Sequence, residues 1–257
     1  MPFYALASEP MPKQLGLQPA ATPVMEHLTD FHNFILVIIT AITLFVLALL
    51  IFIVIRFNAK ANPEPQKFSH NTLIEVIWTV IPIVILIVIA IPSFKLLYYM
   101  DRTADPEMTL NVTGYQWYWG YEYPDHHGIS FNSYMIPDDE IDASKGQKRL
   151  LSVDSPVVLP VDTNIQIIVT AADVLHSYAV PAFGIKTDAV PGRINETWVN
   201  IEKPGRYFGQ CSELCGKGHA FMPTEVIAVP KEEFAAWVEA SKDGYVTYED
   251  FKNAQTK

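Results

Sequence analysis

Two long uncharged segments constrain the fold of this chain more than any other feature. The first, Phe34 to Ile55, contains only Thr40 and Thr43 as polar residues, and the second, Val76 to Pro92, contains only Thr79. A helix rises about 1.5 Å per residue, so the first segment would extend roughly 33 Å, enough to cross the hydrocarbon core of a bilayer. Two buried core helices are the alternative, but at these lengths the pattern favours two membrane-spanning helices.

The short link between the two segments indicates their orientation. It runs from Arg56 to Asn71 and is rich in basic residues, with Glu64 as its one acid. Short basic loops face the cytoplasm or its equivalent, so both ends of the chain are predicted on the opposite side. The expected divisions are an extracytoplasmic tail (1–30), a two-helix transmembrane hairpin (31–100) and an extracytoplasmic domain with a C-terminal helix (101–257).

The tail also contains a possible processing signal. Ala5-Leu6-Ala7 before Ser8 has the small-residue form of a signal-peptidase site, although the residues before it are too few for a signal peptide. The sequence leaves open whether the chain begins inside such a peptide or the match is accidental.

The acidic charge lies on the part of the chain after the second apolar segment. The chain has a formal net charge of −10, and residues 101–257 hold 23 acidic and 13 basic residues. Such a surface keeps a domain soluble and attracts basic partners over long distances. Nucleic acid is disfavoured as a partner because its phosphates would be repelled.

From Met108 onward the pattern becomes that of β-structure. The segment 109–119 alternates and is rich in aromatic and β-branched residues, and many short strands at this spacing predict a sandwich or barrel. Only Lys231 to Lys242 has a helical pattern. The further predicted strands are Val157–Val161, Ile165–Thr170, Thr197–Ile201, Arg206–Gln210 and Glu225–Val229.

One segment near the C-terminus concentrates soft metal ligands. Cys211, Cys215, His219 and Met222 follow one another closely, and the glycines around them favour a wrapping loop over a helix. Thiolate, thioether and imidazole together favour copper, with zinc second. Two thiolates can bridge two copper ions if a second histidine caps the pair, and His176, in a strand-like segment, is the candidate.

Two other interpretations of these ligands remain open at this point. A disulfide is one, because two cysteines four residues apart in an extracytoplasmic domain can pair. A structural zinc site is the other.

Three long motifs resemble subunit II of the haem–copper cytochrome c oxidases: CSELCGKGHAFMP, DVLHSYAVPAFGIKTDAVPGR and GYQWYWGYEY. The resemblance covers nearly the whole chain and implies two transmembrane helices followed by a cupredoxin-like Greek-key β-barrel. It also implies that Glu213 gives a backbone carbonyl to one copper and its side chain to a Mg²⁺ ion shared with the catalytic subunit. The ligands it implies for the dinuclear copper A (CuA) centre are His176, Cys211, Glu213, Cys215, His219 and Met222.

The resemblance further implies roles for residues outside the metal loop. Trp117 matches the residue that receives electrons from cytochrome c, whereas Tyr118 or Trp119 fits the barrel core. Glu122, Asp154 and Asp173 match carboxylates that dock cytochrome c, and Asn132 stands where relatives often carry another acid.

Glu75 matches the acid at the mouth of a proton-uptake path. A capping box with Thr72 at the start of the second helix explains Glu75 equally well by position alone.

The function expected from this resemblance is that of an oxidoreductase and translocase subunit. Electrons would pass from cytochrome c through CuA to subunit I, which holds haem a, haem a3 and CuB and reduces oxygen to water with proton pumping; subunit III is a further expected partner. The expected location is the bacterial inner membrane with the copper domain in the periplasm, or else the mitochondrial inner membrane with that domain in the intermembrane space.

Two other functions compete with this one. A quinol-oxidase subunit II keeps the fold but would lack the copper ligands, and a membrane-tethered copper carrier needs one labile site and no aromatic patch. No Cys-x-x-Cys-His motif is present, so the electron donor is expected to be a separate protein.

Overall fold

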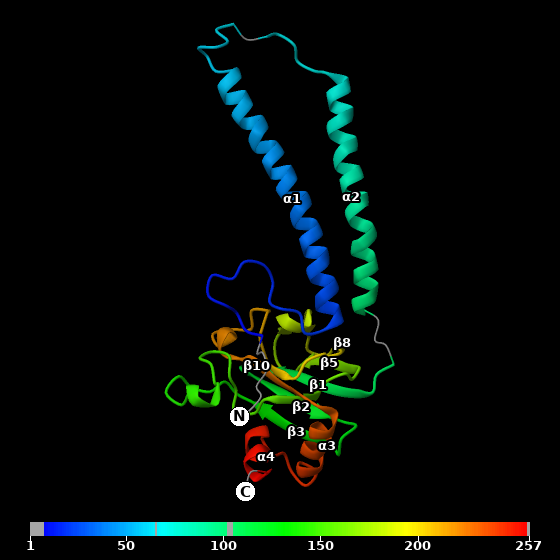
Figure 1. Ribbon diagram of the computed structural model, residues 1–257, viewed down its shortest axis with the longest axis vertical. Coiled ribbons are helices and arrows are strands. Elements are labelled where there is room, and N and C mark those ends of the chain that lie inside the picture. Colours follow the sequence, from blue (N-terminus) through cyan, green and yellow to red (C-terminus); the bar gives the residue numbers. More distant parts are fainter. Residues whose placement is uncertain (1–7, 65, 102–104, 256–257) are drawn as a thin grey trace. The chain divides into compact units, whose positions relative to one another are not determined.

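The computed structural model describes residues 8–64, 66–101 and 105–255, so the Ala5-Leu6-Ala7 motif lies outside the described residues. The chain divides into two compact units (Figure 1). One comprises Met1–His27 together with Tyr99–Lys257, and the other comprises Leu28–Tyr98. The domain divisions expected at residues 30 and 100 stay predictions.

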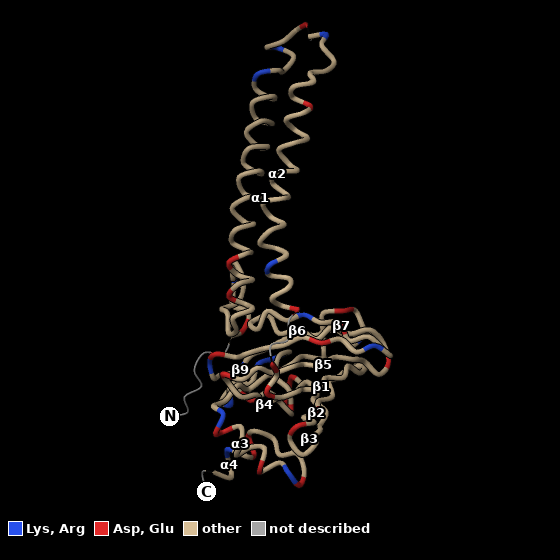
Figure 2. Tube along the Cα trace, turned by 90° about the vertical axis from the view of Figure 1, so that its right-hand side faces the viewer, with Lys and Arg blue, Asp and Glu red and all other residues tan. Residues whose placement is uncertain are grey.

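The unit Leu28–Tyr98 contains most of two long helices. Helix α1 spans Pro23–Arg56 and α2 spans Thr72–Asp101. Both are long and apolar enough to cross a membrane, and none of the residues in their most apolar stretches is buried within the protein. Figure 2 shows no charged residue along the middle of either helix. Leucine, isoleucine and valine side chains exposed in this way need an apolar surrounding, which a bilayer supplies.

The start of α2 differs from the expected capping box. Asn71 rather than Thr72 caps the helix, because its Oδ1 accepts a hydrogen bond from the Ile74 amide at 3.2 Å. Within the described part of the chain the Glu75 carboxylate has no hydrogen-bond partner, although its backbone oxygen accepts one from Thr79. Pro82 and Pro92 lie inside the helix, where a spanning helix tolerates proline.

The other unit, Met1–His27 with Tyr99–Lys257, is built on a five-stranded sheet in the order β3-β2-β1-β5-β8. Its strands β1 and β5 are parallel, while the remaining pairs are antiparallel. Residues of β1 alternate between buried and half-buried, so one face of this sheet covers the core. The bounds are β1 Met108–Tyr115, β2 Tyr118–Tyr123, β3 Ile129–Ser133, β5 Ile165–Ala171 and β8 Asn195–Val199.

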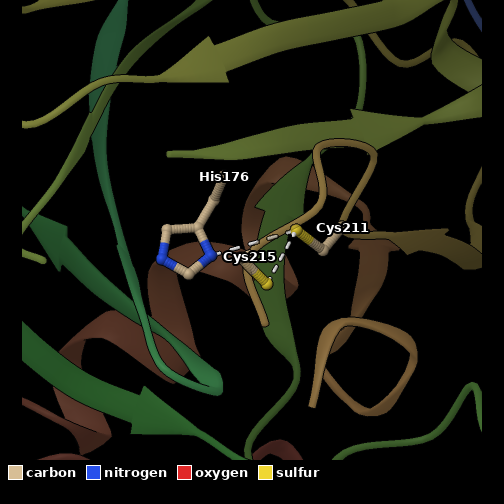
Figure 3. Close-up of side chains that lie close together, drawn as sticks. All are labelled: His176, Cys211 and Cys215. Carbon is tan, nitrogen blue, oxygen red and sulfur yellow. Dashed lines mark hydrogen bonds between the residues drawn. The ribbon is translucent and has the colours of Figure 1, made fainter. Parts of the chain in front are cut away.

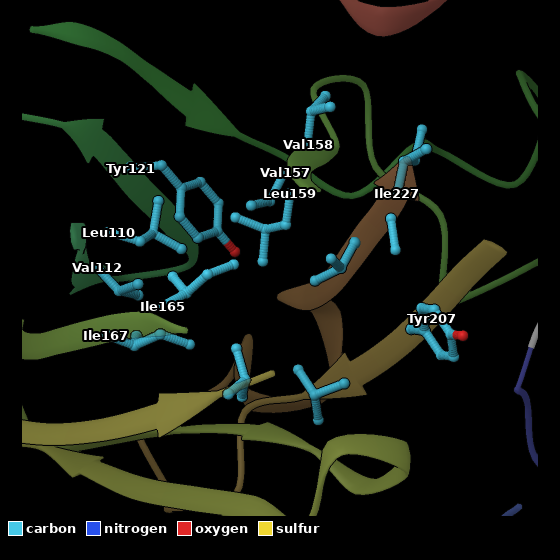
Figure 4. Packing of buried hydrophobic residues seen from close by; sticks show 14 of the residues in the cluster. Leu110, Val112, Tyr121, Val157, Val158, Leu159, Ile165, Ile167, Tyr207 and Ile227 are labelled. Carbon is cyan, nitrogen blue, oxygen red and sulfur yellow. The ribbon is translucent and has the colours of Figure 1, made fainter. Parts of the chain in front are cut away.

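Two smaller sheets complete this domain. One has the order β4-β10-β9 and the other pairs β6 with β7. Every residue of β4 and β10 is buried, so these strands form the interior of a sandwich whose apolar core is drawn in Figure 4. The bounds are β4 Val157–Pro160, β6 His176–Val180, β7 Ile185–Ala189, β9 Gly205–Gln210 and β10 Pro223–Val229.

The cupredoxin-like fold class is therefore confirmed, except that the predicted closed barrel is not seen. The strands of the described residues lie in separate sheets and do not form a closed barrel. The predicted strand at 109–119 is also interrupted, since a turn at Gln116 and Trp117 separates β1 from β2.

Two helices at the C-terminal end cover the core. Helix α3, Lys231–Ala240, matches the predicted helix and buries Phe234, Trp237 and Val238. Helix α4, Tyr248–Gln255, was not predicted. It is fixed to α3 by Glu233, whose Oε1 accepts hydrogen bonds from the Tyr248 hydroxyl at 2.6 Å and from Lys252 at 2.7 Å.

The beginning of α1 belongs to the same unit as the sandwich. Thr22 caps the helix by accepting a hydrogen bond from the Met25 amide at 3.1 Å, and its hydroxyl donates to the carbonyl oxygen of Phe183 at 2.8 Å. Phe183 ends the short 3-10 helix η2 (Pro181–Phe183) that follows β6. The first turn of α1 is thus bonded directly to the segment that follows the strand of His176.

Candidate metal centre

Two strands bring the potential ligands together. His176 begins β6, and Cys211 follows β9 directly. The strands approach so closely at Gly209 that a Cβ atom there would lie 1.9 Å from the carbonyl oxygen of Ala179, so only glycine fits. The Ser212 amide also donates to the Ser177 carbonyl at 3.0 Å, which fixes the start of the metal loop to β6.

The sulfur atoms of the two cysteines lie at the centre of the ligand group. His176, Cys211 and Cys215 are all buried, and their ligand atoms lie within 4.8 Å of one another (Figure 3). The distance between the two Sγ atoms is 3.8 Å, and from Cys211 Sγ it is 3.9 Å to His176 Nδ1 and 3.3 Å to the Glu213 carbonyl oxygen.

The second cysteine has its own set of neighbours. Cys215 Sγ lies 3.7 Å from His219 Nδ1 and 3.6 Å from Met222 Sδ. The ligand group therefore divides into two halves. Each half contains one thiol, one imidazole and one weak donor, which is a carbonyl oxygen beside Cys211 and a thioether beside Cys215.

These distances fit metal ions and do not fit a disulfide. A disulfide needs about 2.05 Å between the sulfur atoms, and both cysteines are free thiols. Metal–sulfur bonds of about 2.3 Å and metal–nitrogen bonds of about 2.0 Å, meeting at tetrahedral angles, separate the ligand atoms by about 3.5–3.8 Å. A single tetrahedral zinc ion would use four donors and leave two unbound, whereas two soft ions sharing the thiolates would use all six.

Asp173 holds the ring of His176. Its Oδ1 accepts a hydrogen bond from His176 Nε2 at 2.9 Å, which leaves Nδ1 directed at Cys211. The same carboxylate accepts hydrogen bonds at 2.7 Å from the backbone amides of Gln116 and Val174. Burial acts to raise the pKa of Asp173, but these hydrogen bonds outweigh it and lower the pKa. An acid that orients a ligating imidazole in this way also raises its basicity.

Two residues of the large sheet support the other sides of the ring. A Cβ atom on Gly114 would lie 2.8 Å from His176 Cδ2, so the ring rests directly on the backbone of β1. Trp119 packs edge-on against the imidazole with ring centroids 5.9 Å apart, and its indole donates to the Met222 carbonyl at 3.2 Å. Trp119 is fully buried, as expected for the core member of the aromatic cluster.

The thiols have the chemistry expected of a buried soft-metal site. Burial first, and the neighbouring Cys211 second, raise the pKa of the Cys215 thiol to about 12. Soft metals bind the thiolate, so metal binding to such a site releases protons.

Trp117 lies against the metal loop. Its indole nitrogen donates to the Cys215 carbonyl at 3.2 Å, and the Gln116 side-chain amide donates to the same oxygen at 2.8 Å. The indole is half-buried and lies so close to the loop that a Cβ on Gly218 would be 2.3 Å from Trp117 Cδ2. Trp117 is therefore both accessible from outside and bonded to the backbone of Cys215, a candidate ligand.

Two of the remaining predicted residues, Glu122 and Asp154, form hydrogen bonds with residues outside the metal loop. Glu122 is exposed and accepts a hydrogen bond from Asn111 at 3.0 Å. Asp154 is exposed and accepts one from the Tyr134 amide at 2.9 Å. Glu213 is exposed as well, and only its backbone oxygen faces Cys211.

Sequence reasoning missed the residues that support the ligands. The sequence predicts Asp173 as a docking acid and Gly218 as part of a loop, and it does not show that Gly114 and Gln116 lie beside the ligands. An isolated glycine within the alternating pattern of a strand, such as Gly114, signals a close approach of another group. Gly114 gives this signal, but the sequence does not show that His176 is the residue that approaches it.

The fold and the ligand group define a membrane-anchored cupredoxin-like protein with a cysteine- and histidine-based soft-metal centre. The family model described as "Cytochrome C oxidase subunit II, periplasmic domain" matches residues 108–229, and "Cytochrome C oxidase subunit II, transmembrane domain" matches residues 10–96. The chain belongs to the cytochrome c oxidase subunit II family.

Individual relatives agree with this assignment. A protein of Rickettsia bellii described as a probable cytochrome c oxidase subunit 2 is 55% identical over 240 residues, covering 93% of this chain and 88% of its own length. Cytochrome c oxidase subunit 2 of Oenothera berteroana is 50% identical over 240 residues, covering 91% and 92%. The crystal structure of the periplasmic domain of subunit II from Bradyrhizobium japonicum shares 48% identity and a TM-score of 0.52, covering 56% of this chain and all of that one.

The family resemblance found in the sequence is thereby confirmed, as are the two membrane helices and the cupredoxin-like domain. The chain is a subunit of cytochrome c oxidase, and its His-Cys-Cys group is consistent with CuA.

Proposed function

We propose that this chain accepts electrons from cytochrome c at a dinuclear CuA centre and passes them to the haem of subunit I. The observation that carries this proposal is the gathering of two imidazoles, a carbonyl oxygen and a thioether around a pair of thiols. The copper ions would be held by six donors: His176, Cys211, the Glu213 carbonyl, Cys215, His219 and Met222. The copper pair, when bound, supplies a one-electron carrier.

The protein's contribution is to hold the donors in place. His176 is fixed by Asp173, Gly114 and Trp119, and the loop is fixed by the hydrogen bonds to the Cys215 carbonyl. A rigid, buried set of donors changes little between oxidation states, so little reorganisation opposes electron transfer. Trp117 is proposed as the residue through which electrons enter, because its half-buried indole is bonded to the backbone of Cys215.

The acidic surface supports docking of a basic donor. Glu122, Asp154 and Asp173 are the proposed docking acids, and the charge of the domain would steer cytochrome c toward them. Because Asp173 also holds His176, its substitution is expected to disturb the copper centre as well as docking. Electron transfer from cytochrome c should slow as ionic strength rises, and a rate independent of salt would contradict the steering.

Two further groups are proposed to serve subunit I. The exposed carboxylate of Glu213 is proposed to reach a Mg²⁺ ion shared with that subunit. Glu75 is proposed as the entrance of a proton-uptake path, and the cap at Asn71 removes the structural explanation that competed with this role. Glu75→Gln should lower turnover and proton uptake without loss of the subunit; full proton uptake would contradict the role.

The proposed setting is the bacterial inner membrane with the copper domain in the periplasm. The proposed partners are subunit I, which holds haem a, haem a3 and CuB, and subunit III. Oxygen reduction coupled to proton pumping is proposed to take place in subunit I. The two apolar helices and the bacterial relative support this setting. Because the chain is also similar to the plant protein, the mitochondrial inner membrane is the alternative setting.

The test compares two tryptophan-to-phenylalanine variants of the oxidase that contains this chain. Trp117→Phe removes the hydrogen bond to Cys215, whereas Trp237→Phe changes a buried tryptophan of α3. We expect stopped-flow reduction by cytochrome c to slow at least tenfold in the first variant, with the near-infrared copper band unchanged, and to keep its rate in the second. A wild-type rate in Trp117→Phe would refute Trp117 as the acceptor.

A further inference from the structure

A positive charge lies over the residue that we propose as the electron acceptor. Lys217 stands between Gly216 and Gly218 in the metal loop, and its side chain is exposed. Its Nζ is 5.7 Å from the centroid of the Trp117 ring, within the range of a cation–π contact. Among the residues that the structure describes, no carboxylate lies within ion-pair distance of Lys217.

This charge is opposite in sign to that of the domain around it. Residues 101–257 carry 23 acidic and 13 basic residues. One of these acids, Asp173, accepts a hydrogen bond from the backbone amide of Gln116, the residue before Trp117. The Asp173 carboxylate already receives hydrogen bonds from Gln116, Val174 and His176. Within the part of the chain that the structure describes, the Lys217 ammonium contacts the indole face and no other partner. Its charge is therefore available to a molecule that approaches Trp117.

We propose that Lys217 is a specificity-determining residue at the point where electrons enter. Its ammonium selects donors whose contacting edge presents a carboxylate or carbonyl oxygen and disfavours donors that present a positive charge there. The basic groups of a donor would instead meet the surrounding carboxylates. This proposal rests on the proposed function of Trp117 as electron acceptor.

The size of the effect follows from Coulomb's law. The Lys217 charge should change the local concentration of a doubly charged reductant, at about 8 Å from Nζ, about 2.2-fold at 0.1 M ionic strength and about 3.8-fold at 0.01 M, relative to an uncharged side chain. The change is an increase for an anion and a decrease for a cation. The ratio of the two rates should therefore change about fivefold at 0.1 M and about fifteenfold at 0.01 M.

The experiment uses the oxidase that contains this chain and two small one-electron reductants of opposite charge. These are the iron(II)–EDTA dianion and the hexaammineruthenium(II) dication, neither of which needs a docking surface. Reduction of the copper centre is followed by stopped flow in wild type and in Lys217→Gln. In the variant we expect the dianion to react about twofold more slowly and the dication about twofold faster at 0.1 M ionic strength.

Lys203→Gln is the matched control because it removes the same charge from the opposite end of β9. Strand β9 lies between Lys203 and Cys211 and, at about 3.3 Å per residue, is roughly 17 Å long, which exceeds the Debye length of about 10 Å at 0.1 M. The rate ratio in this variant should stay within about 1.4-fold of wild type. A shift equal to that of Lys217→Gln would show a global charge effect and overturn the proposal.

The remaining outcomes separate this proposal from the function on which it rests. A change of both rates in the same direction, or no change in either, overturns the role of Lys217 as long as Trp117→Phe still slows cytochrome c. Full rates in Trp117→Phe overturn the acceptor role itself. An unchanged near-infrared band in Lys217→Gln confirms that the copper centre is intact in the comparison.

Discussion

Replacing Gly114 by alanine should displace the imidazole of His176. The new Cβ would lie 2.8 Å from Cδ2, 2.9 Å from Cγ and 3.1 Å from Cβ of that residue. Ordinary carbon contacts begin near 3.4 Å, so the ring must move by about 0.6 Å or more. The ring is fully buried and held by Asp173 and Trp119, so it has no free side to move into.

The consequence should appear in copper binding before it appears in folding. Overpacking of this kind costs about 1–3 kcal/mol of stability. Changes in the support of a ligating histidine lower metal affinity about 10- to 100-fold. We therefore expect Gly114→Ala to keep a cooperative thermal transition at a lower Tm, while copper affinity falls by that factor and the near-infrared band weakens or shifts.

Gly120→Ala on the neighbouring strand is the matched control. A Cβ there would meet Tyr115 Cε2 at 3.0 Å and Asn132 Oδ1 at 3.4 Å, and both atoms belong to the far ends of side chains at the surface that can move. This variant should bind copper as wild type does. If Gly114→Ala binds copper with wild-type affinity and spectrum, the inference that β1 positions His176 is wrong.

Three further changes test other parts of the structure. Gly218→Ala would place a Cβ 2.3 Å from the Trp117 ring; stopped flow should show slower reduction by cytochrome c at full copper content, and an unchanged rate would contradict the proposed path. Glu233 has a pKa below its ordinary value of 4.5, because hydrogen bonds from Lys252 and Tyr248 outweigh the opposing effect of burial. The Glu233 carboxylate thus contributes to stability above pH 4.5, and this contribution is lost as pH falls through the lowered pKa. In urea titrations, the difference in unfolding free energy between wild type and Glu233→Gln should shrink over that pH range. A constant difference would refute the assignment. Thr22→Val removes the cap of α1 and the hydrogen bond to Phe183; it should cost about 1–2 kcal/mol of stability by thermal unfolding with the copper spectrum unchanged, and an unaltered Tm would show that this contact is not stabilising.

The parts of the fold that were predictable are those with a strong local pattern. The two membrane helices follow from length and uninterrupted apolar sequence, and most strands follow from β-branched and aromatic runs. Helix α4 was missed because its eight residues are mostly polar, and its position depends on the contacts of Tyr248 and Lys252 with Glu233. The cap at Asn71 was missed because the neighbouring Thr72 offers an equally good local signal.

In the candidate site too, residues close together in the sequence were predictable, whereas contacts between distant segments were not. The metal loop was predicted because four soft donors lie within one short segment. His176 was predicted because a copper pair needs a second histidine, and the family resemblance implies the same residue. The support of His176 by Gly114 joins segments far apart in the chain, and no local pattern specifies which side chain will rest on a given glycine. The hydrogen bond from the Gln116 amide to Asp173 likewise exists only after β1 and β6 have come together.

The most direct test of the central claim is the metal content of the purified chain, measured together with its near-infrared absorption and the electron paramagnetic resonance of its oxidised form. The account predicts about two copper ions per chain, a near-infrared band, and a hyperfine pattern of one unpaired electron shared by two copper nuclei. A single zinc ion per chain, or a metal-free chain with Cys211 and Cys215 joined in a disulfide, would contradict it.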